Sequence, residues 1–305
     1  MSSTSHPAVP GLLAANLVCM ASMLIWAAGL PAADHLIPLM VHEQLNALRM
    51  GLAGLSVLIA WAVLEGLRPV LRVNWWKGIA VGSLIGLGAW FLILGQARGG
   101  AVTAAVISAT LPVVGIALEV LFDGRRLTLA LGLGLILSLL GGVMALDLRG
   151  ADLSLGWGAL LCFASVVSFA IGSRFTVTAF PDQTPIGRTA VTLTGAAIAA
   201  MAVALAQGAV GTAPPDFSAW GAIEIGAILL YAVGSLGVSQ VMFIMSVEKL
   251  GIGLSAMHIN LAPFYVMLIR LGLGYPWSWS QALAALVVSL GVLIAQGIIP
   301  LGRRP

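Results

Sequence analysis

Residues Cys19–Gly29, CMASMLIWAAG, and residues Cys162–Gly172, CFASVVSFAIG, both fit the pattern C-x-A-S-x3-[WF]-A-x-G. These two stretches contain the only two cysteines of the chain. Two shorter echoes recur in the same order: Glu43-Gln44 before Arg49 with Asp182-Gln183 before Arg188, and Leu111-Pro112 with Ala262-Pro263. Three echoes in one order indicate that the chain is a duplicated unit.

The composition indicates a membrane protein. Of 305 residues, 60% are hydrophobic and 8% are charged, whereas a soluble domain has roughly 25% charged residues. Apolar stretches of about 20 residues, the length of a membrane-spanning helix, recur from end to end. Ten such segments are predicted, at residues 11–30, 42–64, 76–96, 100–121, 127–147, 155–176, 185–208, 218–246, 251–272 and 280–299. The expected fold is therefore an all-α polytopic membrane protein with ten transmembrane helices.

Basic residues predict the orientation, because cytoplasmic loops carry an excess of Lys and Arg. With the N-terminus inside, ten basic residues face the cytoplasm: Arg68, Arg72, Lys77, Arg125, Arg126, Arg174, Arg188, Lys249, Arg303 and Arg304. Four face outside: Arg49, Arg98, Arg149 and Arg270. We therefore expect a multi-pass protein of the cell inner membrane with both termini cytoplasmic. Several tryptophans, Trp61 and Trp76 among them, lie near predicted helix ends, as interface anchors do.

The duplication divides the chain into residues 1–150, with five helices, and residues 151–305, with five more. Because five is odd, the second repeat must enter the membrane from the opposite face. Inverted repeats of this kind are typical of transporters that work by alternating access, with the solute site near the midplane.

The pattern resembles the drug/metabolite transporter superfamily in its EamA-type, ten-helix form. The shared features are Trp26-Ala27-x-Gly29 in the first helix, an Arg early in helices 2 and 7, the Leu-Pro and Ala-Pro pairs in helices 4 and 9, and the glycines around Gly141-Gly142. Members often carry Gly-Glu after helices 4 and 9, where this chain has Phe122-Asp123-Gly124 and Leu273-Gly274-Tyr275. Among the branches, the YddG-type amino acid exporters are the most similar. The resemblance implies a carrier whose path is surrounded by helices 1, 3, 4, 6, 8 and 9.

Helix 8 carries Tyr231, Ser235 and Ser239 at spacings of four, which places a phenol and two hydroxyls on one helical face. Such a stripe either lines a cavity or joins helices, because Ser can bond a backbone carbonyl of its own or a neighbouring helix. We favour the cavity for Tyr231 and Ser235, since a phenol adds a donor and acceptor that packing does not need.

Helix 9 contains His258 at depth, with Asn260 two residues on. Polar groups within a membrane are costly and usually face a cavity or a partner. We expect both to bind the solute, with a hydrogen-bonded, neutral structural histidine as the alternative and a protonation switch as a further step.

Ser22, Trp26 and Trp90 complete the predicted solute site, as an apolar wall with a polar edge. Simple packing is the alternative for both tryptophans. Pro112 and Pro263 are predicted hinges, because a mid-helix proline removes a backbone hydrogen bond and permits a bend.

No carboxylate pair is expected at the midplane, which favours a neutral or zwitterionic solute moved without strong ion coupling. The sequence thus predicts an exporter of amino acids, aromatic ones included, or similar metabolites. The alternatives are a carrier of a drug, nucleoside or sugar with proton coupling through His258, and more distantly an intramembrane enzyme or a non-transporting scaffold. No enzyme activity, metal, cofactor or nucleic-acid partner is expected; the partners are a small solute and the lipid bilayer. Oligomeric state is not encoded.

Overall fold

The structure is a computed structural model that describes residues 9–145, 156–218, 220–272, 274, 276, 277 and 279–299. Within these ranges the secondary structure is entirely helical, without a strand. Six described segments are long and apolar enough to cross a membrane: 11–33, 42–65, 75–95, 157–178, 185–209 and 222–250. Shorter apolar helices cover 129–141, 252–261 and 282–295. The predicted all-α polytopic membrane fold is confirmed.

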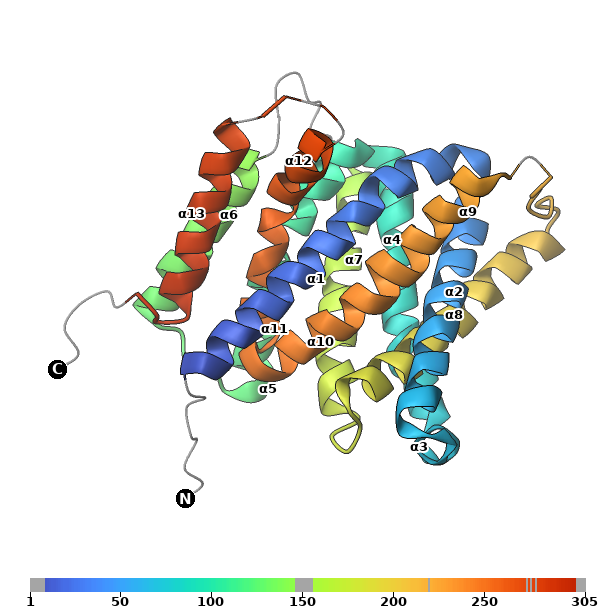
Figure 1. Cartoon of the computed structure of the whole chain (residues 1–305), viewed down its shortest axis with the longest axis horizontal. Helices are drawn as coiled ribbons and strands as arrows, with labels where there is room; N and C mark the ends of the chain where they lie inside the picture. The colour runs from blue at the N-terminus through green and yellow to red at the C-terminus, as the bar shows by residue number, and fades with distance from the viewer. Residues whose placement is uncertain are drawn as a thin grey trace.

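The first half of the chain holds α1 (Val9–Leu36), the short 3-10 helix η1 (Ile37–Leu39), α2 (His42–Glu65), α3 (Leu67–Arg72), α4 (Trp75–Ser108), α5 (Leu111–Asp123) and α6 (Leu129–Ala145). The second half holds α7 (Trp157–Thr178), α8 (Pro185–Ala209), α9 (Ala222–Leu229), the π-helix η2 (Leu230–Val238), α10 (Ser239–Leu250), α11 (Ile252–Ala256), the 3-10 helix η3 (Met257–Leu261), α12 (Ala262–Gly272) and α13 (Trp279–Ala295). Each predicted segment lies on one of these helices or on a consecutive run of them (Figure 1). The predicted boundary between repeats, at residues 150 and 151, lies outside the described residues.

The fourth predicted segment was placed wrongly at its start. Helix α4 is unbroken through residues 97–99, and the interruption comes instead at the turn Ala109–Thr110. Thr110 closes this turn, because its hydroxyl donates to the carbonyl of Ile107 at 2.6 Å. Gln96, Arg98, Gly99 and Gly100 interrupt the apolar run and favoured a break there, yet the helix continues through them.

Pro112 is not mid-helix, contrary to prediction, whereas Pro263 lies inside the continuous helical run 252–272, where 3-10 geometry gives way to α-helix. Pro112 is the second residue of α5 and Pro263 is the second residue of α12. For Pro112 this position costs no intrahelical hydrogen bond, since the N–H that it lacks would have no partner in the first turn. Each proline instead follows an interruption: the turn Ala109–Thr110 before α5, and the 3-10 segment η3 before α12. The two halves are thus interrupted at equivalent places.

Helices that correspond in the two halves run antiparallel. In the α2–α8 pair, Gly54 contacts the backbone of Leu193 while Trp61, further along α2, contacts Gly187. In the α6–α13 pair, Gly134 lies against Gly291, and Gly141 lies against Ala284. Rising numbers on one helix meet falling numbers on its counterpart, which is what inverted repeats require.

The first long helix of each half packs against the third long helix of the other half. Helix α1 packs along η2 and α10, while its counterpart α7 packs along α4 (Figure 1). Helices α4 and α8 approach closely because Gly82 faces the α8 backbone at Thr192 and Gly195, where any side chain would collide. Small residues allow such close packing between membrane helices, and the glycine run Gly78-x3-Gly82-x3-Gly86 provides them on α4.

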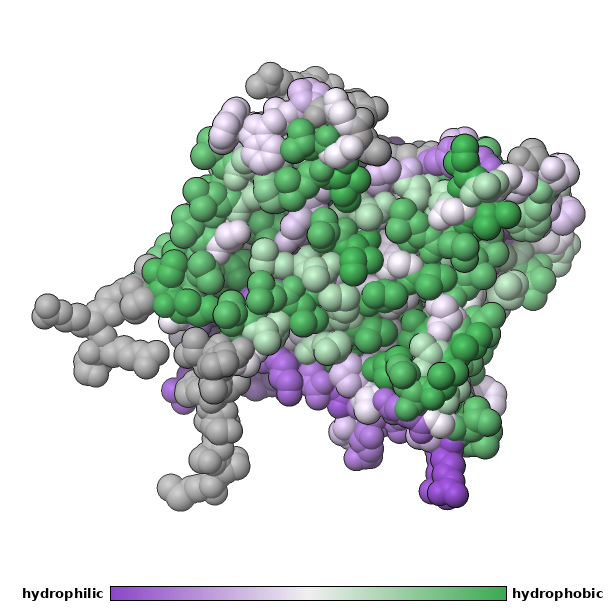
Figure 2. Space-filling model, in the orientation of Figure 1, coloured by the Kyte–Doolittle hydropathy of each residue, from purple (hydrophilic) through white to green (hydrophobic). Residues whose placement is uncertain are grey.

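Apolar side chains cover the middle of the molecule, and hydrophilic residues gather along the edge that carries α3 (Figure 2). Trp76, Trp157 and Trp279 are exposed near helix ends, as expected of interface anchors. Trp61 does not have this role, because it is fully buried against Gly187 and its indole donates to Glu65.

Candidate functional site

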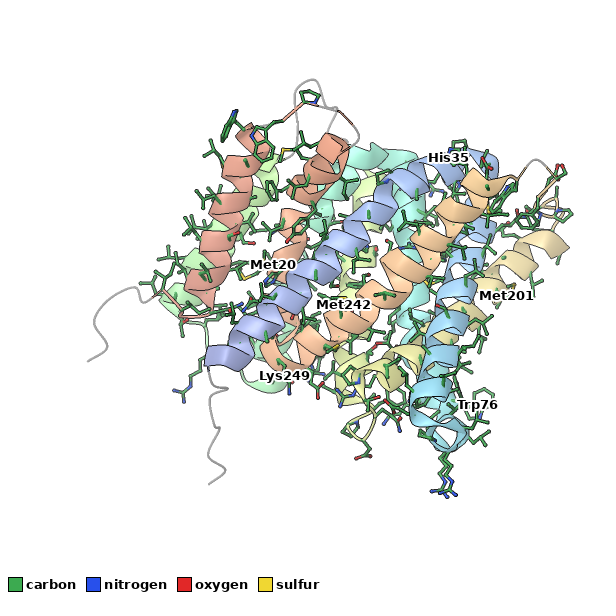
Figure 3. The ribbon with its side chains drawn as sticks, viewed as in Figure 1. Met20, His35, Trp76, Met201, Met242 and Lys249 are labelled. Atoms are coloured by element: carbon green, nitrogen blue, oxygen red, sulfur yellow. The ribbon has the colours of Figure 1, made fainter. Side chains whose placement is uncertain are left out.

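One end of the molecule carries α3, Lys77 and Lys249, and we call it the basic end. Ion pairs and a hydrogen bond join helices at this end. Glu119, buried on α5, is paired with Arg125 and accepts the backbone N–H of Gly253 at 2.9 Å. Arg174 of α7 donates to Asp123 of α5, with Nε 3.1 Å from Oδ2. These pairs join α5 to α7 and α11, so elements of both halves are held together there. Figure 3 shows Lys249 and Trp76 at this edge and His35 at the opposite one.

A cavity of about 170 Å³ lies among α2, α4 and α8, toward the opposite end. Glu43, in the first turn of α2, accepts a hydrogen bond from the Trp90 indole at 3.3 Å. Asn46, one turn further, is only 2% exposed, and its Oδ1 has no hydrogen-bond partner. Among the residues that the structure describes, the lining is Glu43, Asn46, Ser83, Gly86, Leu87, Trp90, Ala199, Ala200 and Val203.

A second group of predicted residues lies where α1 meets η2. The Ser22 hydroxyl donates to the carbonyl of Ser239 at 2.7 Å, and the Ser235 hydroxyl donates to the carbonyl of Trp26 at 2.9 Å. The Tyr231 ring stacks against the Arg49 guanidinium, whose carbon is 3.9 Å from the ring centroid. Both hydroxyls are therefore used in joining the helices.

The backbone of η2 departs from the continuous α-helix that the sequence predicts. Nine residues, Leu230–Val238, form a π-helix. The α-helical rule that residues four apart share one face therefore does not apply to Tyr231 and Ser235. Tyr231, Ser235 and Ser239 are nevertheless all buried. Rare π segments often occur at functional sites in helices.

The third group surrounds η3. His258 is 2% exposed, and its Nδ1 lies 3.2 Å from the carbonyl of Leu254, one turn before it. Asn260 donates to the hydroxyl of Ser138 on α6 at 3.0 Å, while its own Oδ1 lacks a partner. The Tyr265 hydroxyl, on α12, is also buried without a partner. The interrupted helix thus carries several polar groups at depth.

The predicted residues therefore fall into three groups: Trp90 in the cavity, Ser22 with Trp26, Tyr231 and Ser235 between α1 and η2, and His258 with Asn260 on η3. Sequence reasoning missed Glu43 and Asn46 as partners of Trp90. A signal was present, because residues three apart share one helical face and an Asn within an apolar segment is costly.

Comparison with known proteins agrees with this architecture. Residues 13–146 match the EamA-like transporter family. Over 265 residues the chain is 27% identical to a Bacillus subtilis (strain 168) protein named "Uncharacterized transporter YyaM", covering 83% of this chain and 84% of that protein.

A solved structure titled only "Crystal structure of protein" is similar in fold, with a TM-score of 0.75 and 20% identity. The match covers 95% of this chain and 99% of that one. Residues 13–146 are thus similar to the EamA-like transporter family, and the findings together support a membrane transporter.

Proposed function

We propose that the protein is a facilitative carrier that exports amino acids, aromatic ones included, or similar small metabolites across the cell inner membrane by alternating access. The family match and the similar transporter support the general class. The excess of basic residues at one end supports an orientation with both termini in the cytoplasm. The amino acid class rests on the sequence resemblance, and the small cavity of mixed apolar and polar lining among α2, α4 and α8 is compatible with it.

The observation that carries this proposal is the contact between the interrupted helices of the two halves. Helix α5 packs on α11, with Gly115 against Gly253. Each lies beside a break, at Ala109–Thr110 and at η3. Transporters commonly form their solute sites from discontinuous helices of inverted repeats. The seven predicted residues, together with the breaks at Pro112 and Pro263, are proposed to serve solute binding and movement.

The test is counterflow in proteoliposomes, with a labelled panel of aromatic, aliphatic, charged and small polar amino acids. A carrier concentrates label against an unlabelled internal pool, which neither a channel nor a scaffold does. Saturable counterflow that an imposed pH gradient leaves unchanged is expected. The absence of counterflow for every member of the panel, in protein shown to be folded, would contradict the amino acid assignment.

A second candidate function is proton coupling through His258, favoured by the burial of an ionisable ring in the interrupted helix. His258→Ala is expected to lower the counterflow rate at least about tenfold, the usual cost of removing one charge-assisted or buried polar contact. His258→Gln is the matched control, because glutamine keeps a polar side chain but does not titrate in this range. Normal, gradient-independent counterflow in His258→Gln would exclude the coupling role, and a normal rate in His258→Ala would remove the residue from the site.

A further inference from the structure

We infer that the cavity among α2, α4 and α8 is a binding site for the ammonium group of a compact organic cation, with Glu43 as its counter-ion. The inference rests on the proposed function only in treating the ligand as a solute of the carrier. It adds a site that lies apart from the α1–η2 and η3 groups and a ligand class of defined charge.

The polar residues of the lining include two that carry acceptors, Glu43 and Asn46, while the Ser83 hydroxyl donates to the carbonyl of Ile79. From the described side chains, the Glu43 carboxylate receives one hydrogen bond, that of the Trp90 indole, and a carboxylate has room for several more. Asn46 contributes a carbonyl oxygen that is buried without a partner. Buried polar atoms are nearly always satisfied by protein, water or ligand. An ammonium group has three donors and no acceptor, so it complements this pair.

The charge of the cavity also favours a cation. Glu43 is the only charged residue among the lining residues of the described chain. The guanidinium nearest along α2, that of Arg49, is turned to the Tyr231 ring on η2 and is absent from the lining. Trp90 adds an aromatic surface, and Trp is the best aromatic partner for a cation.

Helix geometry alone does not account for these features. A glutamate in a first turn is favourable because of the helix dipole, and that effect explains Glu43 by itself. It does not explain an unpartnered Asn46 oxygen beside it, nor an indole from another helix that fixes the carboxylate at the cavity.

The remaining lining sets the size and nature of the ligand. Leu87, Ala199, Ala200 and Val203 form an apolar wall, which suits a hydrocarbon body attached to the ammonium group. An apolar cavity of about 150 Å³ is known to hold benzene. A volume of about 170 Å³ therefore fits an amine whose body is one small ring or a short branched chain.

The experiment is calorimetric titration of the full-length protein in lipid nanodiscs, with empty nanodiscs as the blank. Benzylammonium is the probe, and benzyl alcohol is its neutral counterpart of the same shape. Wild-type protein is expected to bind benzylammonium about tenfold more tightly than the alcohol, since hydrogen bonds to charged groups are roughly twice as strong as neutral ones. Equal affinity for the two compounds, or no binding of benzylammonium, would overturn the inference without the need for any variant.

Variants then assign the site. Glu43→Gln is expected to lower benzylammonium affinity about tenfold while leaving the affinity for benzyl alcohol unchanged. Asn46→Leu should fill part of the cavity and lower the affinity for both benzylammonium and benzyl alcohol. Glu224→Gln is the control: this carboxylate bonds His35 at 3.0 Å and does not line the cavity. Unchanged benzylammonium selectivity in a folded, monodisperse Glu43→Gln protein would refute the role of Glu43.

Amino acid counterflow separates this inference from the proposed function. Counterflow that persists while benzylammonium fails to bind would reject the ammonium site alone. Benzylammonium binding in a protein without counterflow would reject the carrier proposal alone.

Discussion

The two copies of the C-x-A-S pattern lie in corresponding helices but are held by different contacts. Helix α1 is joined to η2 and α10 by serine hydroxyls that donate to carbonyls across the interface: Ser22 to Ser239, Ser235 to Trp26 and Ser246 to Ala15. Helix α7 meets α4 mainly through glycines that bring the backbones together: Gly88, Gly95 and Gly172. One hydroxyl, of Ser168, donates across that contact to Leu84.

This difference shows that the repeated pattern specifies a close helix approach and not a particular chemistry. Hydroxyl bonds between membrane helices contribute little each, because a separated hydroxyl finds another carbonyl. Packed backbones lose their van der Waals contacts when they move apart. We therefore expect α1 to move relative to η2 during transport, while α7 and α4 move as one body.

The largest expected effect on stability comes from replacing Arg49 or Arg188, which follow Glu43-Gln44 and Asp182-Gln183 in the two halves. Arg188 is buried, and its guanidinium donates to the carbonyls of Phe180 and Pro181 and lies 3.3 Å from Glu248. With the residues that the structure describes, Arg49 makes the ring contact with Tyr231 and a long 3.4 Å bond to its carbonyl. Arg188→Met is expected to destabilise the protein by about 3 kcal/mol, as breaking a buried pair does, and Arg49→Met by about 1 kcal/mol.

Unfolding in mixed detergent and SDS micelles, followed by tryptophan fluorescence, measures both variants. Glu248→Gln serves as a control, since it removes the ion pair but leaves the two carbonyl contacts of Arg188. Equal losses for the two arginine variants would mean that the two halves are anchored alike.

An intermediate loss of stability is expected from substituting Gly29 or Gly95. A Cβ on Gly29 would overlap the Ser235 side chain, whereas a Cβ on Gly95 would meet backbone atoms of Gly158 and Cys162 at 3.0 Å as well as the Cys162 sulfur. Gly29→Ala and Gly95→Ala should each cost about 2 kcal/mol through overpacking. Ser235→Gly should recover about 1 kcal/mol of the Gly29→Ala loss, a coupling typical of residues in contact.

Cys162→Ala is the matched second change for Gly95→Ala. It should recover much less, because the backbone atoms of α7 remain in place. Double-mutant cycles from thermal unfolding in detergent give both coupling energies. Similar recovery at the two sites would show that α7 is no more rigidly packed than α1.

The sequence predicted the number and order of the apolar segments because hydropathy over 20 residues is a strong signal. It also predicted inversion, since the echoes and an odd helix count together require it. It did not predict the break at Ala109–Thr110, the π-helix at Leu230–Val238 or the 3-10 segment at Met257–Leu261. These local backbone geometries depend on which groups of neighbouring helices hydrogen-bond a few backbone carbonyls. Residues far apart in sequence supply those groups.

The candidate site shows the same limit. The polar residues at depth, such as His258 and Asn260, were recognisable because they are rare in apolar segments. Which of them would share a cavity was not recognisable. Trp90 was expected beside Ser22 and Trp26, but it lies with Glu43 of α2. The sequence could single out Glu43 and Asn46 on one face of α2, but the packing of both α2 and α4 on α8, which brings them to Trp90, is not recorded in either segment.

The smallest expected effect tests the comparison most directly. Ser22→Ala and Ser168→Ala each remove one hydroxyl-to-carbonyl bond of 2.7 Å from corresponding interfaces. Each should lower stability by only about 0.6 kcal/mol, the average for such bonds in a membrane protein. Their effects on amino acid counterflow should differ, because a bond that breaks and reforms during transport changes the rate, while a bond within one rigid body does not. A change in the maximal rate for Ser22→Ala alone, at an unchanged half-saturating concentration of solute, would identify α1–η2 as a moving interface. The same change for Ser168→Ala alone would place the movement between α7 and α4 instead.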